Sequence, residues 1–267
     1  MKILHYVGVF SLPTETFIYD LINNLEESGL DNHIITHNRQ LEEERPCKNV
    51  KVISEKASFI KKVYFRLFRK WNIRNEKDVI RYIKNLNPDR IHAHFGPNGV
   101  KIYNLLKKYN LNIPLIVSFH GTDTTMYPLQ YGKYKNIAQQ MTNNNNITFT
   151  FPSNFLKQEF QKNFKIEANK NQIVLPNSFN KNFITSKQKI KQKSDKLKLI
   201  SVGRLINWKG FESLIKAFTI LNDKLENVEL KIIGAGIEEI NLNKKTFGIY
   251  YLNIIFIEFY LGDHYCQ

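Results

Sequence analysis

Pro114-Leu115-Ile116-Val117-Ser118-Phe119-His120-Gly121-Thr122-Asp123 is the stretch of sequence that decides the fold. Its first half is a continuous apolar run, typical of a parallel strand that helices cover on both faces. Its second half places a histidine and a glycine just after the strand, at the edge where open parallel sheets bind ligands. We therefore expect an α/β fold with a site near His120, although a buried structural histidine would give the same pattern.

On either side of this stretch, short apolar runs alternate with helical patterns. Strands are expected at Ile3–Phe10, Asn32–Thr36, Val50–Ile53, Arg90–Ala93, Ile147–Phe151 and Gln172–Leu175. One helix is expected to follow Thr14, a candidate N-cap, and to end at Gly29. Further helices are expected at Lys77–Leu86, Gly99–Tyr109, Lys133–Met141 and Ser153–Phe164, with a loop at Asn143–Asn146. This alternation predicts parallel strands joined by crossover helices.

Residues 180–196 differ in composition, because lysine, serine and glutamine replace nearly all large apolar side chains. We expect a linker there, between an N-terminal domain of residues 1–179 and a second domain of residues 197–267. In the second domain, strands are expected at Leu197–Val202, Val228–Ile233 and Leu252–Ile257, and helices at Gly210–Leu221 and Gly236–Lys244. This domain is shorter than the typical size of about 100 to 150 residues, so we expect it to be incomplete.

The 267-residue chain carries a formal charge of +15, which favours anionic partners such as nucleic acid, nucleotide phosphates or an acidic membrane face. Lysine and asparagine occur 31 times each, so the A-rich codons that they share are an equal explanation of the excess. The two cysteines, Cys47 and Cys266, offer neither a disulfide framework nor a zinc site, and a reducing, cytoplasmic location fits best. The longest apolar stretch, Gly248–Gly262, is shorter than the about 18 residues of a membrane-spanning helix.

Other candidate site residues also follow expected strands. His92 and His94 lie two residues apart and so share one face of their strand. They could form a metal pair, but no acidic residue or cysteine is near them in the sequence, so polar histidines lining a cleft are the favoured interpretation. Arg204 and Lys209 could grip a diphosphate, and Gly234-Ala235-Gly236 supplies a second glycine turn. Neither segment matches Walker A or the complete dinucleotide fingerprint.

Taken in order, eight segments resemble glycosyltransferase family 4 (group 1), whose members have the GT-B fold. The segments are Pro13–Ile18, His92–Gly96, Ser118–Asp123, Pro152–Leu156, Leu175–Ser178, Val202–Leu205, Lys209–Phe211 and Ile233–Gly236. The first of them is similar to the start of members that build exopolysaccharide, capsule and lipopolysaccharide. The resemblance covers residues 1–244 and implies a complete N-terminal Rossmann-like domain followed by a partial second one.

The resemblance also implies a function, that of a retaining glycosyltransferase. Such an enzyme moves a sugar from a nucleotide-sugar donor to a glycan or lipid-linked acceptor in surface polysaccharide biosynthesis. By resemblance, His120 would be the catalytic residue beside the transferred sugar, and the donor diphosphate would bind Arg204, Lys209, Gly234 and Gly236. The acceptor side would be lined by Thr14, Glu15, Thr16, His94 and Asp123. Two fixed cations can stabilise the leaving diphosphate, so neither a metal nor another cofactor is expected.

One departure from the family concerns two acidic residues, separated by seven positions, that its second domain normally carries. No such pair follows Leu197: eight positions beyond Glu238, Glu239 and Glu258 stand Thr246, Phe247 and Cys266. We expect a chain truncated in its second domain, which could make it inactive. The alternative is a non-catalytic remnant or partner-binding module of the same fold. Nucleic-acid binding ranks last, because the sequence has no recognition helix or aromatic RNA-binding strand.

Phe59–Trp71 has an amphipathic pattern, with aromatic and aliphatic residues at helical spacing and lysines and arginines between them. Such a helix could rest on an anionic membrane, which would place the protein at the inner face of that membrane. An ordinary helix packed on the sheet is the favoured interpretation.

Overall fold

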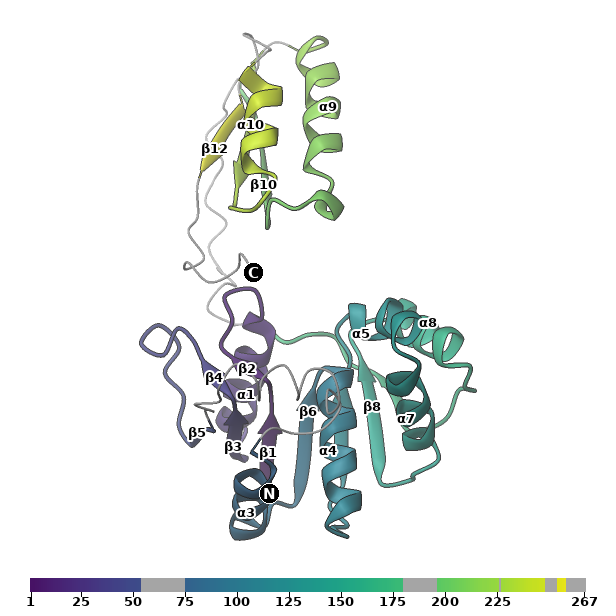
Figure 1. Cartoon of the computed structure of the whole chain (residues 1–267). Helices are drawn as coiled ribbons and strands as arrows, with labels where there is room; N and C mark the ends of the chain where they lie inside the picture. The colour runs from purple at the N-terminus through teal and green to yellow at the C-terminus, as the bar shows by residue number, and fades with distance from the viewer. Residues whose placement is uncertain (54–74, 180–195, 226, 248–253, 258–267) are drawn as a thin grey trace, which may run out of the picture. The chain divides into compact units, whose positions relative to one another are not determined.

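The computed structural model describes residues 1–53, 75–179, 196–225, 227–247 and 254–257 (Figure 1). The chain divides into two compact units, residues 1–183 and residues 184–267. Each unit is an α/β layer structure of its own. The predicted amphipathic segment Phe59–Trp71 lies outside the described residues.

The first unit is built on a parallel sheet of seven strands in the order β5-β3-β1-β6-β7-β8-β9. These strands are β1 (Lys2–Tyr6), β3 (Asp31–Thr36), β5 (Val50–Val52), β6 (Arg90–His94), β7 (Leu115–Ser118), β8 (Ile147–Phe151) and β9 (Gln172–Val174). Since every neighbouring pair is parallel, all the carboxyl ends meet at one edge of the sheet. The expected site at the end of β7 therefore lies at the edge where such sheets bind ligands.

The helices of this unit are α1 (Thr16–Glu27), α3 (Glu76–Leu86), α4 (Gly96–Lys108), α5 (Thr122–Thr125), α6 (Tyr127–Gln130), α7 (Gly132–Thr142) and α8 (Asn154–Phe164). They cover both faces of the sheet. Ile34 belongs to the apolar cluster that holds α1, whereas its neighbour Ile35 belongs to the larger cluster around α3, α4, α7 and α8. Successive strand residues point to opposite faces, so the two clusters lie on opposite sides.

The expected alternation of strands and helices is confirmed, with three differences besides the short helices α5 and α6, which were not expected. The first expected strand is broken: β1 ends at Tyr6, and β2 (Val9–Phe10) pairs instead with β4 (Asn38–Arg39). Thr14 is not the N-cap of α1, because Glu15 takes that place without a side-chain cap bond. The expected stop at Gly29 is confirmed by its left-handed φ of 82°.

The third difference is the start of α4, which begins at Gly96 rather than Gly99. The amide of Gly96 donates to the Asp123 carboxylate at 2.9 Å, so a residue far along the chain satisfies the first turn of this helix. A Cβ at Gly96 would lie 2.1 Å from the Tyr134 hydroxyl oxygen and 2.5 Å from the Phe119 ring. Only glycine therefore fits at this helix start.

The second unit has a parallel sheet of three described strands, β10 (Leu197–Val202), β11 (Val228–Ile233) and β12 (Ile254–Ile257). Its helices are α9 (Phe211–Asn222) and α10 (Glu239–Phe247), and a short 3-10 turn, Asn207–Lys209, precedes α9. A small core joins Leu205, α9 and β11. The expected elements are confirmed, but α10 begins at Glu239 because the residues from Gly234 to Glu238 form a loop against Leu205. Within the described part of the chain, no helix is long and apolar enough to cross a bilayer.

Candidate functional site

Three buried histidines lie together at the carboxyl ends of β1 and β6. His5 is paired in register with His92, and the rings of His92 and His94 are 4.2 Å apart between centroids. His5 Nδ1 is 3.1 Å from His94 Nε2, and His5 Nε2 is 3.0 Å from the side-chain oxygen of Asn32. His92 Nε2 contacts the Ser118 hydroxyl at 2.7 Å. The expected shared face of His92 and His94 is confirmed, whereas His5 is a member that sequence reasoning missed.

His120, the second residue after β7, is held between two aromatic rings. Its ring centroid lies 4.6 Å from that of Phe17 and 4.7 Å from that of Phe95. Both ring nitrogens are buried and have no hydrogen-bond partner among the described residues. Burial lowers the pKa of His120 to about 4, so the ring is neutral at pH 7. A neutral imidazole offers one donor and one acceptor, and both are available to a ligand.

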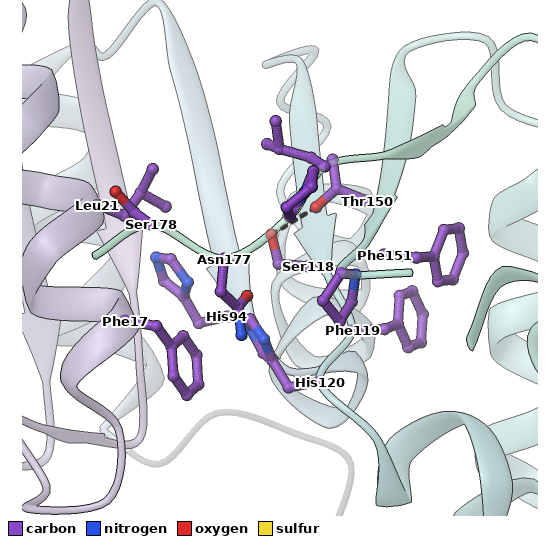
Figure 2. A pocket seen from close by; sticks show the side chains of 13 residues that line it. Phe17, Leu21, His94, Ser118, Phe119, His120, Thr150, Phe151, Asn177 and Ser178 are labelled. Atoms are coloured by element: carbon purple, nitrogen blue, oxygen red, sulfur yellow. Dashed lines mark hydrogen bonds between the residues drawn. The ribbon is translucent and has the colours of Figure 1, made fainter. Parts of the chain in front are cut away.

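His94 and His120 border the same pocket (Figure 2). This cavity of about 170 Å³ is lined by Phe17 and Leu21 of α1 and by Leu175, Pro176 and Asn177 after β9. We call it the histidine pocket. Its walls are largely apolar, and its few polar groups include the two imidazoles and the side chains of Ser118, Thr150, Asn177 and Ser178, as is typical of small-molecule sites.

Asp123 holds the turns that carry His120. Its side chain is 2% exposed, and its carboxylate accepts hydrogen bonds from the backbone amides of Gly96, His120 and Gly121 at 2.8–3.0 Å. Burial raises the pKa of Asp123, and these amide donors act in the opposite direction. The carboxylate therefore joins the end of β6 to the end of β7 and fixes the backbone of His120.

A second pocket, of about 350 Å³, lies beside the first loop and includes Glu15, Asn98 and Asp123 among its lining residues. Phe95 also lines it and has an unusual left-handed φ of 72°. The remaining residues expected on the acceptor side, Thr14 and Thr16, are exposed and line neither of these two pockets. The structure thus brings together only part of the expected acceptor set.

In the second unit, Arg204 and Lys209 follow the end of β10 and are exposed. The loop that carries them is fixed by the glycine turn after β11. The amide of Leu205 donates to the carbonyl of Ala235 at 3.0 Å, and a Cβ on Gly234 would lie 1.9 Å from the carbonyl oxygen of Gly203. A Cβ on Gly236 would lie 2.3 Å from the carbonyl oxygen of Leu205. The two glycines therefore serve the close approach of these loops.

A family model described as Glycosyltransferase Family 4 matches residues 14–180, more than half of the chain. The chain belongs to this family. A second model, described as Glycosyl transferases group 1, matches residues 182–249. The two matches together extend over both units and confirm the resemblance drawn from the sequence segments.

A curated relative is similar over most of this chain. An uncharacterized glycosyltransferase of Haemophilus influenzae is 28% identical over 235 residues, which are 86% of this chain and 60% of that protein. The chain thus spans about three fifths of the length of this curated relative.

Two solved structures show the same fold. Anabaena HepE in complex with UDP is 17% identical with a TM-score of 0.70, over 97% of this chain and 70% of that one. WaaG, a glycosyltransferase involved in lipopolysaccharide biosynthesis, is 14% identical with a TM-score of 0.62, over 96% and 70%. The expected α/β fold of the GT-B type, with two Rossmann-like units, is confirmed.

His5, His92 and His94 each place one ring nitrogen within 4.8 Å of the others, a spacing at which three histidines can hold a metal ion. Each ring already uses at least one nitrogen within the protein. The network is therefore explained by hydrogen bonding among neutral imidazoles.

The buried histidines predict loss of stability in acid. Burial lowers the pKa of His5 and of His120 to about 4, and it lowers those of His92 and His94 well below their usual value. Unfolded histidines titrate near their usual pKa of about 6.5, so below that pH the unfolded state binds more protons. We expect the contribution of these histidines to the free energy of unfolding to level off above pH 6.5 and to fall toward pH 4, with a slope of up to about 1.4 kcal/mol per pH unit from each histidine.

Urea unfolding at pH 7, 6, 5 and 4.5 measures this dependence. His120→Asn removes one of the four groups and should make the slope shallower. Equal stability of the unsubstituted protein at pH 7 and pH 5 would contradict neutral burial of these rings.

Proposed function

We propose that this protein is a retaining glycosyltransferase that transfers a sugar from a nucleotide-sugar donor to a glycan or lipid-linked acceptor. The observation that carries the proposal is His120, a neutral imidazole with both nitrogens unpartnered among the described residues. It faces a pocket at the carboxyl end of the sheet, in the unit that the family 4 model matches. The UDP bound by HepE supports a nucleotide donor.

The chemistry assigns separate roles to the two units. Breaking the anomeric bond leaves negative charge on the departing nucleoside diphosphate and positive charge on the sugar. Arg204 offers a forked donor and Lys209 a point charge, and both can stabilise the diphosphate as it departs. The turns at Gly234 and Gly236 allow the phosphates to approach the backbone. No metal ion or other cofactor is needed for this charge stabilisation.

On the first unit, we assign His120 to the transferred sugar as the catalytic residue. Glu15 in the second pocket, with Thr14 before it and Thr16 at the start of α1, is assigned to the acceptor. Asp123 also lines that pocket, but its carboxylate is engaged by three backbone amides, so we assign it to positioning His120. The acceptor is proposed to belong to surface polysaccharide biosynthesis. Contact of residues 59–71 with an anionic membrane and a cytoplasmic location stay predictions of the sequence.

Thermal unfolding in the presence of nucleotides tests the proposal. UDP, GDP, ADP, dTDP and their common sugar conjugates are each added at saturating concentration, with the nucleosides as controls. A ligand present at about 100 times its Kd stabilises the folded state by about 2.7 kcal/mol, which shifts the melting temperature by several degrees. At least one nucleoside diphosphate should do this. If no nucleotide of the panel raised the melting temperature, the proposed donor class would be contradicted.

A further inference from the structure

A chain of hydrogen bonds behind the histidine pocket fixes which ring nitrogen carries the proton in His5 and in His94. The chain begins at Asn32, which is buried on β3. The side-chain amide nitrogen of Asn32 donates to the carbonyl of Leu30 at 3.2 Å, so its oxygen is the atom that faces His5. That oxygen can only accept. His5 Nε2, 3.0 Å away, must therefore carry a hydrogen and donate it.

The second step passes through His5 to His94. Burial keeps His5 neutral, so a ring with hydrogen on Nε2 has a bare lone pair on Nδ1. His94 Nε2 lies 3.1 Å from His5 Nδ1, and of these two nitrogens only His94 Nε2 can donate a hydrogen bond. The proton of His94 is thereby placed on Nε2. Its other ring nitrogen, Nδ1, is left as a bare acceptor.

His94 Nδ1 is the end of this chain. It is buried, and it has no hydrogen-bond partner among the described residues, although its ring lines the histidine pocket. An unpaired buried acceptor costs free energy in the free protein, and a ligand that supplies a donor recovers it. Figure 2 shows the ring beside His120, whose proton no neighbour in the described residues fixes.

We propose that the histidine pocket is a hydroxyl-selective subsite, in which Asn32 and His5 are positioning residues that present His94 Nδ1 as an acceptor for an alcohol O–H. A hydroxyl group fits both rings, because it donates to His94 while its oxygen accepts from the N–H of His120. A fully ionised phosphoryl oxygen has no hydrogen to donate to His94 Nδ1, so this acceptor favours a hydroxyl group over a diphosphate. This inference rests on the proposed function, and it assigns the histidine pocket to the hydroxyl face of a sugar.

Nitrogen NMR of the histidine rings in the full chain tests the tautomers without any enzymatic activity. Protein labelled with nitrogen-15 in histidine is recorded at pH 7 by long-range proton–nitrogen correlation, which separates protonated from bare ring nitrogens. We expect His5 and His94 both to be protonated on Nε2 only. Hydrogen on His94 Nδ1, or an imidazolium at either ring, would overturn the proposal.

Two variants of His5 separate positioning from mere packing. The amide oxygen of His5→Asn occupies the place of Nδ1 and can still accept from His94, whereas His5→Leu offers no acceptor. The Nε2-protonated form of His94 should persist in His5→Asn and should become a mixture of tautomers in His5→Leu. The same mixture in both variants, or in neither, would contradict the relay. Because the wild-type spectrum is recorded first, poor folding of either variant leaves the tautomer test standing.

The ligand class is tested with two small probes at molar concentration. Glycerol offers hydroxyl groups, and sulfate is an anion without a proton at neutral pH. Glycerol should move the His94 Nδ1 resonance toward the position of a hydrogen-bonded nitrogen, and sulfate should leave it in place. A response to sulfate, or none to glycerol, would reject a hydroxyl-selective pocket. These outcomes differ from failure of the proposed function, which is measured by nucleotide binding and turnover.

Discussion

Replacing Asp123 with alanine should lower the free energy of unfolding by about 3–5 kcal/mol, because three backbone amides lose a charged acceptor in the protein interior. The amides are those of Gly96, His120 and Gly121. The loss acts on two elements at once, since the carboxylate satisfies the first turn of α4 and also holds the turn after β7. We also expect the backbone at His120 to become mobile, so activity should fall in the fraction that stays folded.

Urea unfolding of Asp123→Ala measures this effect, and Asp78→Ala is the matched control. Asp78 is 56% exposed and pairs with Arg81 three residues along α3 at 3.3 Å. An exposed pair of this kind contributes at most about 1 kcal/mol, so the control should unfold nearly as the wild type does. If Asp123→Ala were as stable as Asp78→Ala, the carboxylate would not hold the two turns together.

Replacing Arg204 with alanine should lower the rate of nucleoside diphosphate release about 10²–10³-fold, the usual cost of removing one group that stabilises charge in the transition state. Stability should hardly change, because the side chain is exposed and makes no ion pair within the described residues. Backbone contacts fix the loop after β10, so the loop should keep its conformation when the Arg204 guanidinium is removed. Arg204→Lys should recover only part of the rate, since an ammonium cannot form the bidentate contact.

Steady-state assays of nucleoside diphosphate release measure this loss, and Arg81→Ala serves as a control with the same change of charge. Arg81 is 70% exposed on α3, in the other unit. Its replacement should leave the rate within twofold. If Arg204→Ala reduced the rate no more than Arg81→Ala does, the assignment of the diphosphate to this loop would be wrong.

The sequence predicted the fold well because parallel strands buried on both faces are continuous apolar runs. Residues 114–119 illustrate this, since they include β7. The two helices Thr122–Thr125 and Tyr127–Gln130 were missed, because four residues are too few to show a helical period. The start of α4 was misplaced, because its first amide is satisfied by Asp123, which is distant in sequence.

The site was predicted in part. His94 and His120 follow directly from their places at strand ends, and the structure brings both to one pocket. His5 was missed because it stands inside an apolar run, and only the register between β1 and β6 places it opposite His92. The sequence did hold a usable signal, because the strands expected at Ile3–Phe10 and Arg90–Ala93 each carry a histidine. The backbone role of Asp123 had no sequence signal, because its amide donors come from two separate turns.

Turnover of sugar nucleotides by the wild-type chain and by His120→Ala tests the central claim most directly. The claim is that the neutral ring of His120 meets the transferred sugar at the carboxyl end of the sheet. We predict that the wild type releases nucleoside diphosphate from at least one sugar nucleotide of the panel. His120→Ala should release it at least about 10²-fold more slowly, while nucleoside diphosphates still raise its melting temperature. Equal rates for the two proteins would contradict the account.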